Sequence, residues 1–229
     1  MKAPSGPAGL ILQHEDAAPA ALFADWCERR DIPYEVLRVW EDGLPADPRG
    51  RPWICSLGSD HSPGAADAPG WVDEEVAYLR LAIEADVPVL GLCFGGQALA
   101  AAAGAQIGPA DPPEVGWLDI ETADPDEIPS GPWLYFHYDQ FALPFGAEEL
   151  ARSPAGPAAF RLGRHLGLQF HPEATPAIVD GWCASDEERL VPLGISRSAV
   201  AIAGREKQRA AELAAEILFD RWWASLGID

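Results

Sequence analysis

The sequence has few basic residues, because 16 lysines and arginines stand against 36 acidic residues and give a formal net charge of −20. It holds no Lys/Arg cluster that could neutralise a row of phosphates, so we do not expect nucleic acid as a partner. The expected use of the acidic surplus is solvation of the surface, with contact to a basic patch on a partner protein as the alternative.

Cysteines are also few, and they lie far apart. The four are Cys27, Cys55, Cys93 and Cys183, and none forms a CxxC pair with another. This spacing favours neither a zinc site nor a disulfide framework, and it predicts reduced thiols. We therefore expect neither a metal nor a cofactor.

Long apolar runs are missing as well. No segment approaches the ~20 apolar residues that span a bilayer, and the apolar run near the N-terminus is too short for a secretory signal. We therefore expect a cytoplasmic protein that does not contact a membrane. The chain also lacks a GxxxxGK[ST] phosphate loop and a Ser-Gly-Gly-x-Asp run, so it is not expected to activate an acceptor with ATP.

The apolar pattern predicts a single α/β domain over residues 1–229. Apolar strands at 9–13, 34–40, 53–59 and 87–93 alternate with helical stretches at 18–31 and 71–86. Such alternation predicts a three-layer sandwich with a mostly parallel central sheet. Strand-like segments between residues 116 and 170 predict a small antiparallel extension.

Other segments carry weaker signals of structure. The Pro-rich stretches 43–52 and 109–113 predict loops. Residues from about 175 to 229 are expected to be mainly helical. In the last helical stretch, the residues expected to dock on the body are Leu213, Ile217, Phe219 and Trp223.

The stretch VPVLGLCFGGQALAAAAGA, residues 87–105, ends an apolar strand at Cys93 and surrounds the cysteine with glycines. Gly91 and Gly95 give the pattern G-x-[nucleophile]-x-G of a nucleophile elbow. Such a turn places the thiol at a helix N-terminus, which favours a thiolate, and frees the N–H of Phe94 to face an oxyanion. The alternative is an ordinary buried thiol beside glycines that end a strand.

A partner for this cysteine occurs in LGLQFHPEAT, residues 166–175, where His171 and Glu173 flank Pro172. Residues two apart in an extended chain project to the same side. Glu173 can therefore accept a hydrogen bond from one ring nitrogen of His171 and leave the other nitrogen facing the thiol. The alternative for so short a motif is a loop with a surface histidine.

Together these segments resemble the class I, triad-type glutamine amidotransferases, particularly the GMP-synthase-like branch. GLCFGGQ resembles the family's G-x-C-x-G-x-Q segment, and FHPE is similar to its His-x-Glu segment. The resemblance implies a flavodoxin-like form of the α/β fold. It also implies that Cys93 attacks the side-chain amide of glutamine, that His171 acts as base and then as acid, and that Glu173 orients His171.

Weaker matches extend the resemblance over most of the chain. CSLGSDHS stands where the family has its oxyanion glycine, which implies that Gly58 and Phe94 form the oxyanion hole. Gln97 resembles the family glutamine that contacts the substrate, with a structural polar residue as the alternative. Tyr138 and Asp139 fall in HYD, where relatives commonly have H-G-D, a segment that faces the α-amino and α-carboxylate groups of glutamine. PEVGW, residues 113–117, is similar to an E-[IV]-G-W segment.

Three functions fit these residues. The first, which we favour, is a glutamine amidotransferase that forms a cysteine thioester and releases ammonia for a separate synthetase or biosynthetic enzyme. The second is a γ-glutamyl peptidase or γ-glutamyl-amine hydrolase with the same triad, since the same acyl-enzyme forms when a larger amine leaves. The third is an inactive binding or regulatory subunit, against which the intact triad argues.

Overall fold

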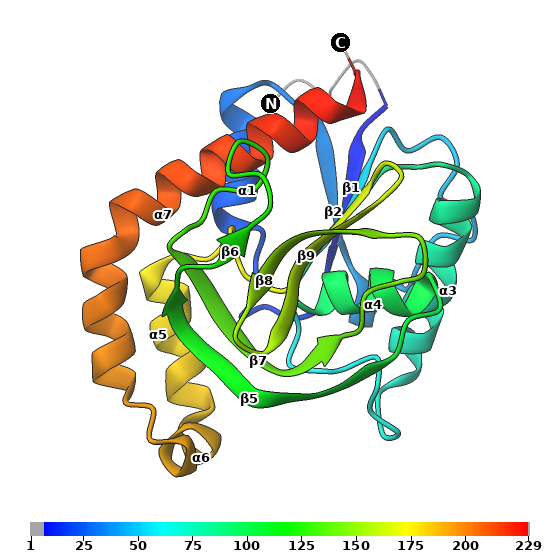
Figure 1. Ribbon diagram of the computed structural model, residues 1–229. Helices are drawn as coiled ribbons and strands as arrows, with labels where there is room; N and C mark the ends of the chain where they lie inside the picture. Colours follow the sequence, from blue (N-terminus) through cyan, green and yellow to red (C-terminus); the bar gives the residue numbers. More distant parts are fainter. Residues whose placement is uncertain (1–6, 229) are drawn as a thin grey trace.

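The computed structural model describes residues 7–228, which contain two β-sheets (Figure 1). The strands are β1 (Gly9–Gln13), β2 (Tyr34–Arg38), β3 (Ile54–Ser56), β4 (Val89–Leu92), β5 (Ile107–Leu118), β6 (Glu121–Thr122), β7 (Trp133–Phe141), β8 (Glu148–Ser153), β9 (Gly156–Leu162) and β10 (His165–Leu168). Within this part of the chain, one sheet has the order β2-β1-β3-β4-β10-β9-β8-β6, and the other pairs β5 with β7.

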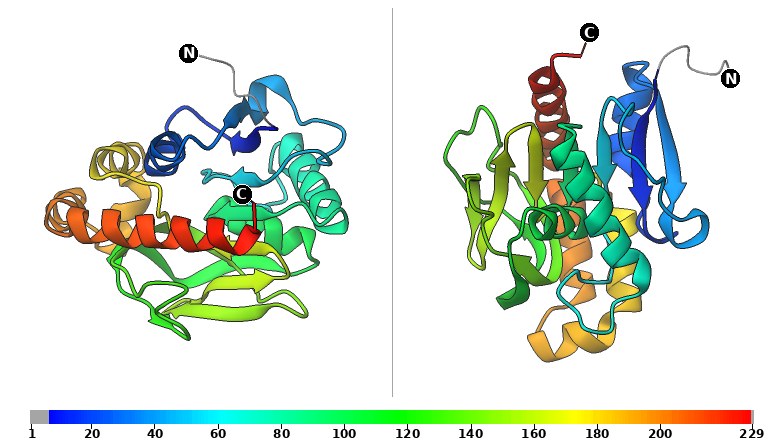
Figure 2. Two further views of the ribbon diagram at one scale, coloured as in Figure 1. Left: turned by 90° about the horizontal axis from the view of Figure 1, so that it is seen from above. Right: turned by 90° about the vertical axis from the view of Figure 1, so that its right-hand side faces the viewer.

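Helices cover both faces of the larger sheet, as the two views of Figure 2 show. They are α1 (Ala21–Arg29), α2 (Val39–Asp42), α3 (Gly70–Glu84), α4 (Phe94–Ala102), α5 (Pro176–Ser185), α6 (Glu187–Leu190) and α7 (Arg197–Leu226), with a short 3₁₀ helix at Val191–Leu193.

The larger sheet is parallel on one side and antiparallel on the other. Strands β2, β1, β3, β4 and β10 run parallel to one another, whereas β10 with β9, β9 with β8 and β8 with β6 form antiparallel pairs. The predicted α/β fold, with a mostly parallel central sheet and an antiparallel extension, is therefore confirmed.

Alternate residues of β1 face the two helical layers. Ile11 belongs to the core that contains Phe23 of α1 and Phe219 of α7, and Leu10 and Leu12 belong to the core beneath α3 and α4. This period of two is expected for a strand that is buried on both faces. Side chains of β1 thus hold together all three layers of the sandwich.

The direction of strand addition reverses beside β1. The chain passes from β1 to β2 on one side of the sheet, and then to β3 and β4 on the other side. In open α/β sheets, the carboxyl ends of the strands at such a switch point form a ligand crevice. Here β1, β3 and β4 are followed directly by His14, Leu57 and Cys93.

Two predicted segments differ from the structure. Residues 34–40, predicted as one strand, form β2 and then begin helix α2. Residues 109–113, predicted as a loop, lie within β5, although the pairing of β5 with β7 is interrupted between Pro109 and Glu114. Proline has no N–H to donate to a ladder, but its fixed φ fits an extended strand at a bulge, so the segment stays extended without pairing.

Helix α7 docks through two of the four predicted residues, Phe219 and Trp223, whereas Leu213 and Ile217 face away from the core. Leu213 and Ile217 are 44% and 42% exposed, whereas Phe219 is buried and Trp223 packs against the core while half-buried. Alanines contribute much of the docking stripe, because a small side chain lets a helix approach its neighbours closely. The buried residues of this stripe are Ala211, Ala214, Ala215, Leu218, Phe219, Trp222 and Leu226.

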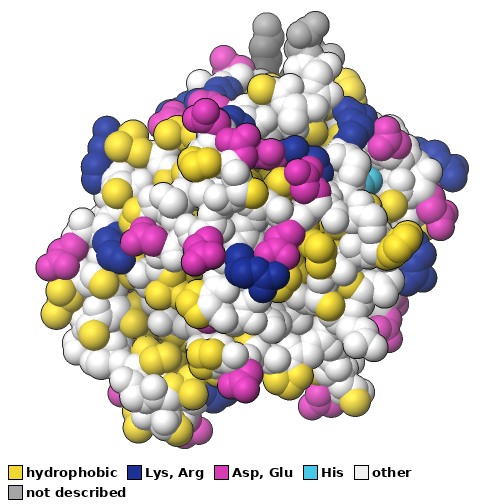
Figure 3. All heavy atoms as spheres, viewed as in Figure 1, with side chains coloured by type: hydrophobic (Ala, Val, Ile, Leu, Met, Phe, Trp, Pro, Cys, Tyr) yellow, Lys and Arg dark blue, Asp and Glu magenta, His cyan; other side chains and the backbone are white. Residues whose placement is uncertain are grey.

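The acidic surplus is dispersed on the face shown in Figure 3, where Asp and Glu are interspersed with Lys and Arg. Between residues 7 and 228, no helix is long and apolar enough to cross a bilayer.

Candidate active site

Cys93 forms the turn between β4 and α4. Its backbone has φ of 51° and ψ of −105°, a conformation that non-glycine residues rarely adopt and that costs on the order of 1–3 kcal/mol. The turn is anchored because the N–H of Cys93 donates to the carbonyl oxygen of Leu168 in β10 at 2.9 Å. The predicted elbow geometry is therefore present, with the thiol at the N-terminus of α4.

The glycines around Cys93 leave room for close backbone packing. A Cβ atom at Gly91 would overlap the Gly95 carbonyl, and a Cβ atom at Gly95 would overlap the Ser56 carbonyl of β3. A Cβ atom at Gly96 would overlap the Leu168 carbonyl. Helix α4 can therefore start directly above β3, β4 and β10.

His171 follows β10 closely and is held by the chain and by Glu173. Its backbone N–H donates to the carbonyl oxygen of Leu134 in β7 at 2.8 Å. Its ring atom Nδ1 lies 2.8 Å from Oε1 of Glu173. Both side chains are buried. The ring also packs against Trp182 of α5, with 4.8 Å between ring centroids. These contacts leave Nε2 as the ring nitrogen available to a partner such as Cys93.

Burial by itself would lower the pKa of His171, because it disfavours the charged imidazolium. The Cys93 and Glu173 charges and the hydrogen bonds of both side chains to His171 act more strongly in the opposite direction, and together they raise the pKa of His171 to about 10. An imidazolium at this position can hold a thiolate at Cys93 and later supply a proton to a leaving group.

Six of the predicted site residues line a single cavity of about 600 Å³, and they are Gly58, Cys93, Gln97, Tyr138, Asp139 and His171. Glu173 lies behind His171, and Phe94 would contribute through its backbone N–H.

The other cysteines are less suited to act as nucleophiles. Burial raises the pKa of the Cys27 thiol to about 12 and of the Cys183 thiol to about 11. In residues 7–228, no group of three or more His, Cys, Asp or Glu side chains is placed to hold a metal.

Gly58 and Phe94 present backbone donors near the thiol. Neither N–H has an acceptor among the described residues. Gly58 also packs closely on His171, because a Cβ atom at residue 58 would lie 2.6 Å from Cε1 of the ring. A side chain at position 58 would clash with the imidazole, so only glycine fits at this point of the loop after β3.

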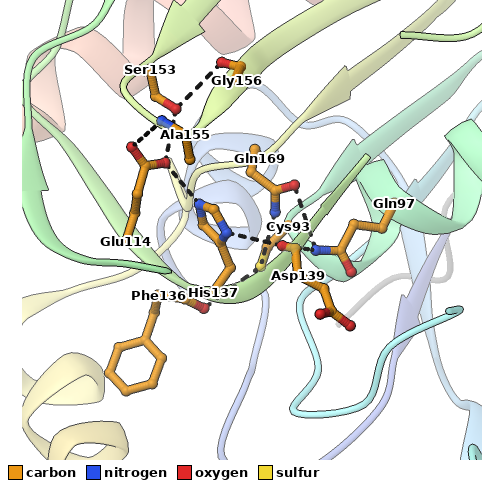
Figure 4. Close-up of polar contacts among 10 residues, drawn as sticks. All are labelled: Cys93, Gln97, Glu114, Phe136, His137, Asp139, Ser153, Ala155, Gly156 and Gln169. Carbon is orange, nitrogen blue, oxygen red and sulfur yellow. Dashed lines mark hydrogen bonds and ion pairs between the residues drawn. The ribbon is translucent and has the colours of Figure 1, made fainter. Parts of the chain in front are cut away.

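Gln97 and Asp139 meet on one side of the cavity. The Nε2 atom of Gln97 donates to the Asp139 carbonyl at 2.7 Å and lies 3.5 Å from Oε1 of Gln169. Gln169 in turn donates to Sγ of Cys93 at 3.8 Å, and Figure 4 shows this chain of side chains from α4 to the cysteine. The sequence analysis did not identify Gln169, although it stands two residues before His171.

A second buried network supports β7 from behind, as Figure 4 also shows. Nε2 of His137 lies 3.0 Å from Oε2 of Glu114, and Nδ1 lies 2.9 Å from the Asp139 carbonyl. Ser153 donates to the same Glu114 oxygen at 2.8 Å. The network fixes the backbone of residues 137–139, which was expected to face the substrate.

Tyr138 points towards α5 and α6 and forms one wall of the cavity. Its hydroxyl donates to Oδ2 of Asp186 at 2.5 Å, and the Arg189 guanidinium lies over its ring at 4.1 Å. Asp186 and Arg189 were not predicted as site residues, because they lie 48 residues or more beyond Tyr138 and carry no motif of their own.

The raised pKa of His171 predicts an alkaline limit for activity. Turnover through Cys93 is expected to fall as the pH rises through about 10, because neutral His171 cannot protonate a leaving group. Alkylation of Cys93 by iodoacetamide needs no such proton and should persist.

The proton on His171 also stabilises the fold. This stabilisation is complete below pH 6.5 and is lost as the pH rises through about 10. Rates of both reactions, measured from pH 7 to 11 beside thermal unfolding, check this expectation, which a parallel fall of both rates in folded protein would contradict.

The fold and the site define an α/β protein whose strand-to-helix turn presents a cysteine to a His-Glu pair. The family model for glutamine amidotransferase class-I matches residues 61–181 of the chain. The chain therefore belongs to the class I glutamine amidotransferase family, and the predicted resemblance is confirmed.

Curated relatives include two glutamine-hydrolyzing GMP synthases. The protein of Thermomicrobium roseum is 35% identical over 156 residues, and that of Aeropyrum pernix is 33% identical over 163 residues. These alignments cover 65% and 64% of this chain, but only 27% and 31% of the relatives. The chain thus matches about a third or less of their length.

Two solved structures match this chain over nearly its whole length. A glutamine amido transferase of Methylobacillus flagellatus has a TM-score of 0.85 at 27% identity, with 96% of this chain and 94% of that chain covered. A glutamine amidotransferase of Thermotoga maritima has a TM-score of 0.82 at 19% identity, with 94% and 97% covered. At 19% identity, the likeness to this second structure concerns the fold alone.

Proposed function

We propose that this chain is a glutaminase domain that converts glutamine to glutamate and ammonia for a separate acceptor enzyme. The observation that carries the proposal is the placement of Cys93, at a strained strand-to-helix turn, in one cavity with the buried His171–Glu173 pair. Family membership and the similarity to glutamine-hydrolyzing GMP synthases support glutamine as the substrate.

In the proposed reaction, the Cys93 thiolate attacks the side-chain amide carbon of glutamine and forms a tetrahedral oxyanion. The N–H groups of Phe94 and Gly58 stabilise that oxyanion. Protonated His171 gives its proton to the amide nitrogen, the C–N bond breaks, and ammonia leaves a γ-glutamyl thioester on Cys93. His171, now neutral, accepts a proton from water as it attacks the thioester, and glutamate leaves as the thiolate is restored.

Gln97, Tyr138 and Asp139 are proposed to surround the rest of the substrate. Gln97 is itself held by the Asp139 carbonyl, so it can also act by fixing the 137–139 backbone. This second role agrees with the structural alternative for Gln97.

A γ-glutamyl peptidase or γ-glutamyl-amine hydrolase is the second candidate, because the cavity has room for a larger substrate. A volume of about 600 Å³ lies within the ~300–1,000 Å³ of pockets that bury drug-sized ligands. An amide larger than glutamine would therefore fit, with the Tyr138, Asp186 and Arg189 wall beside its amine part.

We expect the purified protein to turn over glutamine slowly, because the acceptor enzyme is absent, and to prefer no substituted amide. The test compares kcat/KM for glutamine, a γ-glutamyl peptide and a γ-glutamyl amine, with Cys93→Ala as the control for contaminating activity. Tyr138→Gly and Tyr138→Phe then separate the volume of the side chain from its hydroxyl group. A preference above about tenfold for a substituted amide, worth ~1.4 kcal/mol, would support the second candidate instead.

A further inference from the structure

A chain of buried polar side chains lies behind the loop that carries Gly58. Nδ1 of His14 lies 3.1 Å from the Gly58 carbonyl oxygen, and Nε2 lies 2.7 Å from Oε2 of Glu75 in α3. Ser56, the last residue of β3, donates to the other carboxylate oxygen of Glu75 at 2.6 Å. We call these three side chains the His14 network. None of them lines the cavity that contains Cys93.

Burial of the ionisable side chains of the His14 network costs free energy of folding, so stability does not explain their presence. The side chains of His14 and Glu75 are both 0% exposed, and Glu75 shares its face of α3 with Val72 and Leu79. Replacing a buried ion pair by apolar groups is often neutral or stabilising. Apolar residues at positions 14 and 75 together would therefore serve the core equally well, which points to a role other than stability.

The hydrogen bonds fix which atom of His14 carries a proton. The Gly58 carbonyl can only accept, so Nδ1 must donate to it. Nε2 either donates to an ionised Glu75 or accepts from a protonated one, and Ser56 donates to Glu75 in both cases. The network is neutral overall in either form, and the bond to Gly58 is kept in both.

Two separate hydrogen bonds hold the peptide bonds on the two sides of Gly58. The carbonyl of Leu57 accepts from the N–H of Gly95 at 3.0 Å, and the carbonyl of Gly58 is held by His14. Because a trans peptide places its C=O and N–H on opposite sides, these contacts also direct the N–H groups of Gly58 and Ser59.

The His14 ring contacts the second backbone donor as well. It packs edge-on against Phe94, with 4.7 Å between centroids, and stacks on Trp71 at 5.2 Å. The next residue, Glu15, accepts from the N–H of Asp60 at 3.0 Å and holds the far end of the same loop. The end of β1 therefore contacts both residues whose N–H groups are proposed to face the oxyanion.

We propose that the His14 network positions the oxyanion hole. In this proposal, which rests on the glutaminase function proposed above, the bond from Gly95 to the Leu57 carbonyl sets the direction of the Gly58 N–H towards the oxyanion. His14 holds the next peptide through the Gly58 carbonyl, so that Gly58 cannot rotate between the two and stays packed on His171. Glu75 and Ser56 act through His14, since Glu75 fixes the ring and its proton and Ser56 fixes the carboxylate. All three are positioning residues, because none touches the substrate.

The first test is His14→Phe, which keeps an aromatic ring between Trp71 and Phe94 but removes the donor. We expect kcat to fall at least tenfold, and by no more than the ~10²–10³-fold that loss of a whole oxyanion donor costs, with KM changed by less than threefold. Both glutamine and γ-glutamyl-p-nitroanilide are used as substrates, so that acylation can be followed even where glutamine turnover is slow.

The second test uses Glu75→Leu and its conservative counterpart Glu75→Gln. We expect Glu75→Leu to lower kcat at least tenfold at a temperature where the variant is fully folded, and to lower the midpoint of thermal unfolding as well, because it leaves His14 and Ser56 buried without a partner. Glu75→Gln should recover most of this loss, because its amide can donate to Nε2 and accept from Ser56. Glu74→Leu, on the exposed face of α3, is the matched control and should leave kcat unchanged.

A further readout separates positioning from general damage. Alkylation of Cys93 by iodoacetamide displaces iodide at a saturated carbon and forms no oxyanion, so His14→Phe should alkylate at the wild-type rate. An unchanged kcat in folded His14→Phe would overturn the proposal and leave the glutaminase function intact. A fall in alkylation and in the unfolding midpoint together would overturn it in favour of a purely structural role. Wild-type protein that hydrolyses neither glutamine nor γ-glutamyl-p-nitroanilide above the Cys93→Ala background would instead refute the glutaminase function.

Discussion

Replacing Cys93 by alanine is expected to abolish glutamine hydrolysis, with a loss of roughly 10⁴–10⁶-fold in kcat. Without the thiol, no γ-glutamyl thioester can form, and the remaining groups can only bind and polarise the amide. The fold should stay intact, because alanine at the turn leaves the backbone contact with Leu168 in place. Ammonia release, measured beside circular dichroism and thermal unfolding, checks both parts of this expectation.

Cys27→Ala is a matched control for this variant. Cys27 lies in α1, is buried in the core and does not line the cavity. Its replacement should leave kcat within about twofold of the wild type. If Cys93→Ala retained more than a tenth of the activity while Cys27→Ala lost it, the assignment of the nucleophile would be wrong.

Replacing His171 by alanine is expected to remove activity almost as completely, because members of a triad act as a unit. Glu173→Ala should leave at least tenfold more activity than His171→Ala, since Glu173 orients the ring but does not transfer the proton. Glu173→Gln should retain still more, because its amide oxygen can accept the hydrogen bond from Nδ1 that Glu173 accepts at 2.8 Å. Steady-state kinetics of the three variants give the order directly.

The opposite order would contradict the roles proposed here. If Glu173→Ala were the most damaging of the three variants in folded protein, then Glu173 would do more than orient His171. A full pH profile for Glu173→Gln adds an independent readout. Its alkaline limit should lie below that of the wild type, because loss of the Glu173 charge removes one of the groups that raise the pKa of His171.

The parts of the site that could be predicted from the sequence are local in the chain. The turn at Cys93 follows from an apolar strand and two flanking glycines, and the His171–Glu173 contact follows from a spacing of two residues. Both patterns need only a few neighbouring positions to specify the geometry. The parallel sheet was predictable for the same reason, since each strand and helix carries its own period.

The contacts that support these residues could not be read in this way. His14 meets Glu75 across 61 residues, and Tyr138 meets Asp186 across 48. Tertiary packing sets these pairs, and no local pattern specifies them. One signal was available, because Glu75 falls on the same helical face as Val72 and Leu79, and a carboxylate on an apolar face indicates a buried polar partner.

Two local predictions were wrong for reasons of tertiary structure. A 30-residue helix such as α7 offers several apolar stripes, and the body contacts the one that joins Phe219 to the alanines, so Leu213 and Ile217 were wrongly placed although Phe219 and Trp223 were not. The prolines at 109–113 indicated a loop, but β5 continues through them because its bulge needs no hydrogen bonds there.

In the proposed reaction, Cys93 carries the γ-glutamyl group. The most direct test is to incubate the protein with a glutamine analogue that bears an electrophilic ketone in place of the side-chain amide, and to map the adduct by peptide mass spectrometry. We predict one adduct, on Cys93, which excess glutamine prevents and which His171→Ala forms far more slowly. Modification mainly at Cys27, Cys55 or Cys183, or labelling of Cys93 that glutamine does not slow, would contradict the claim.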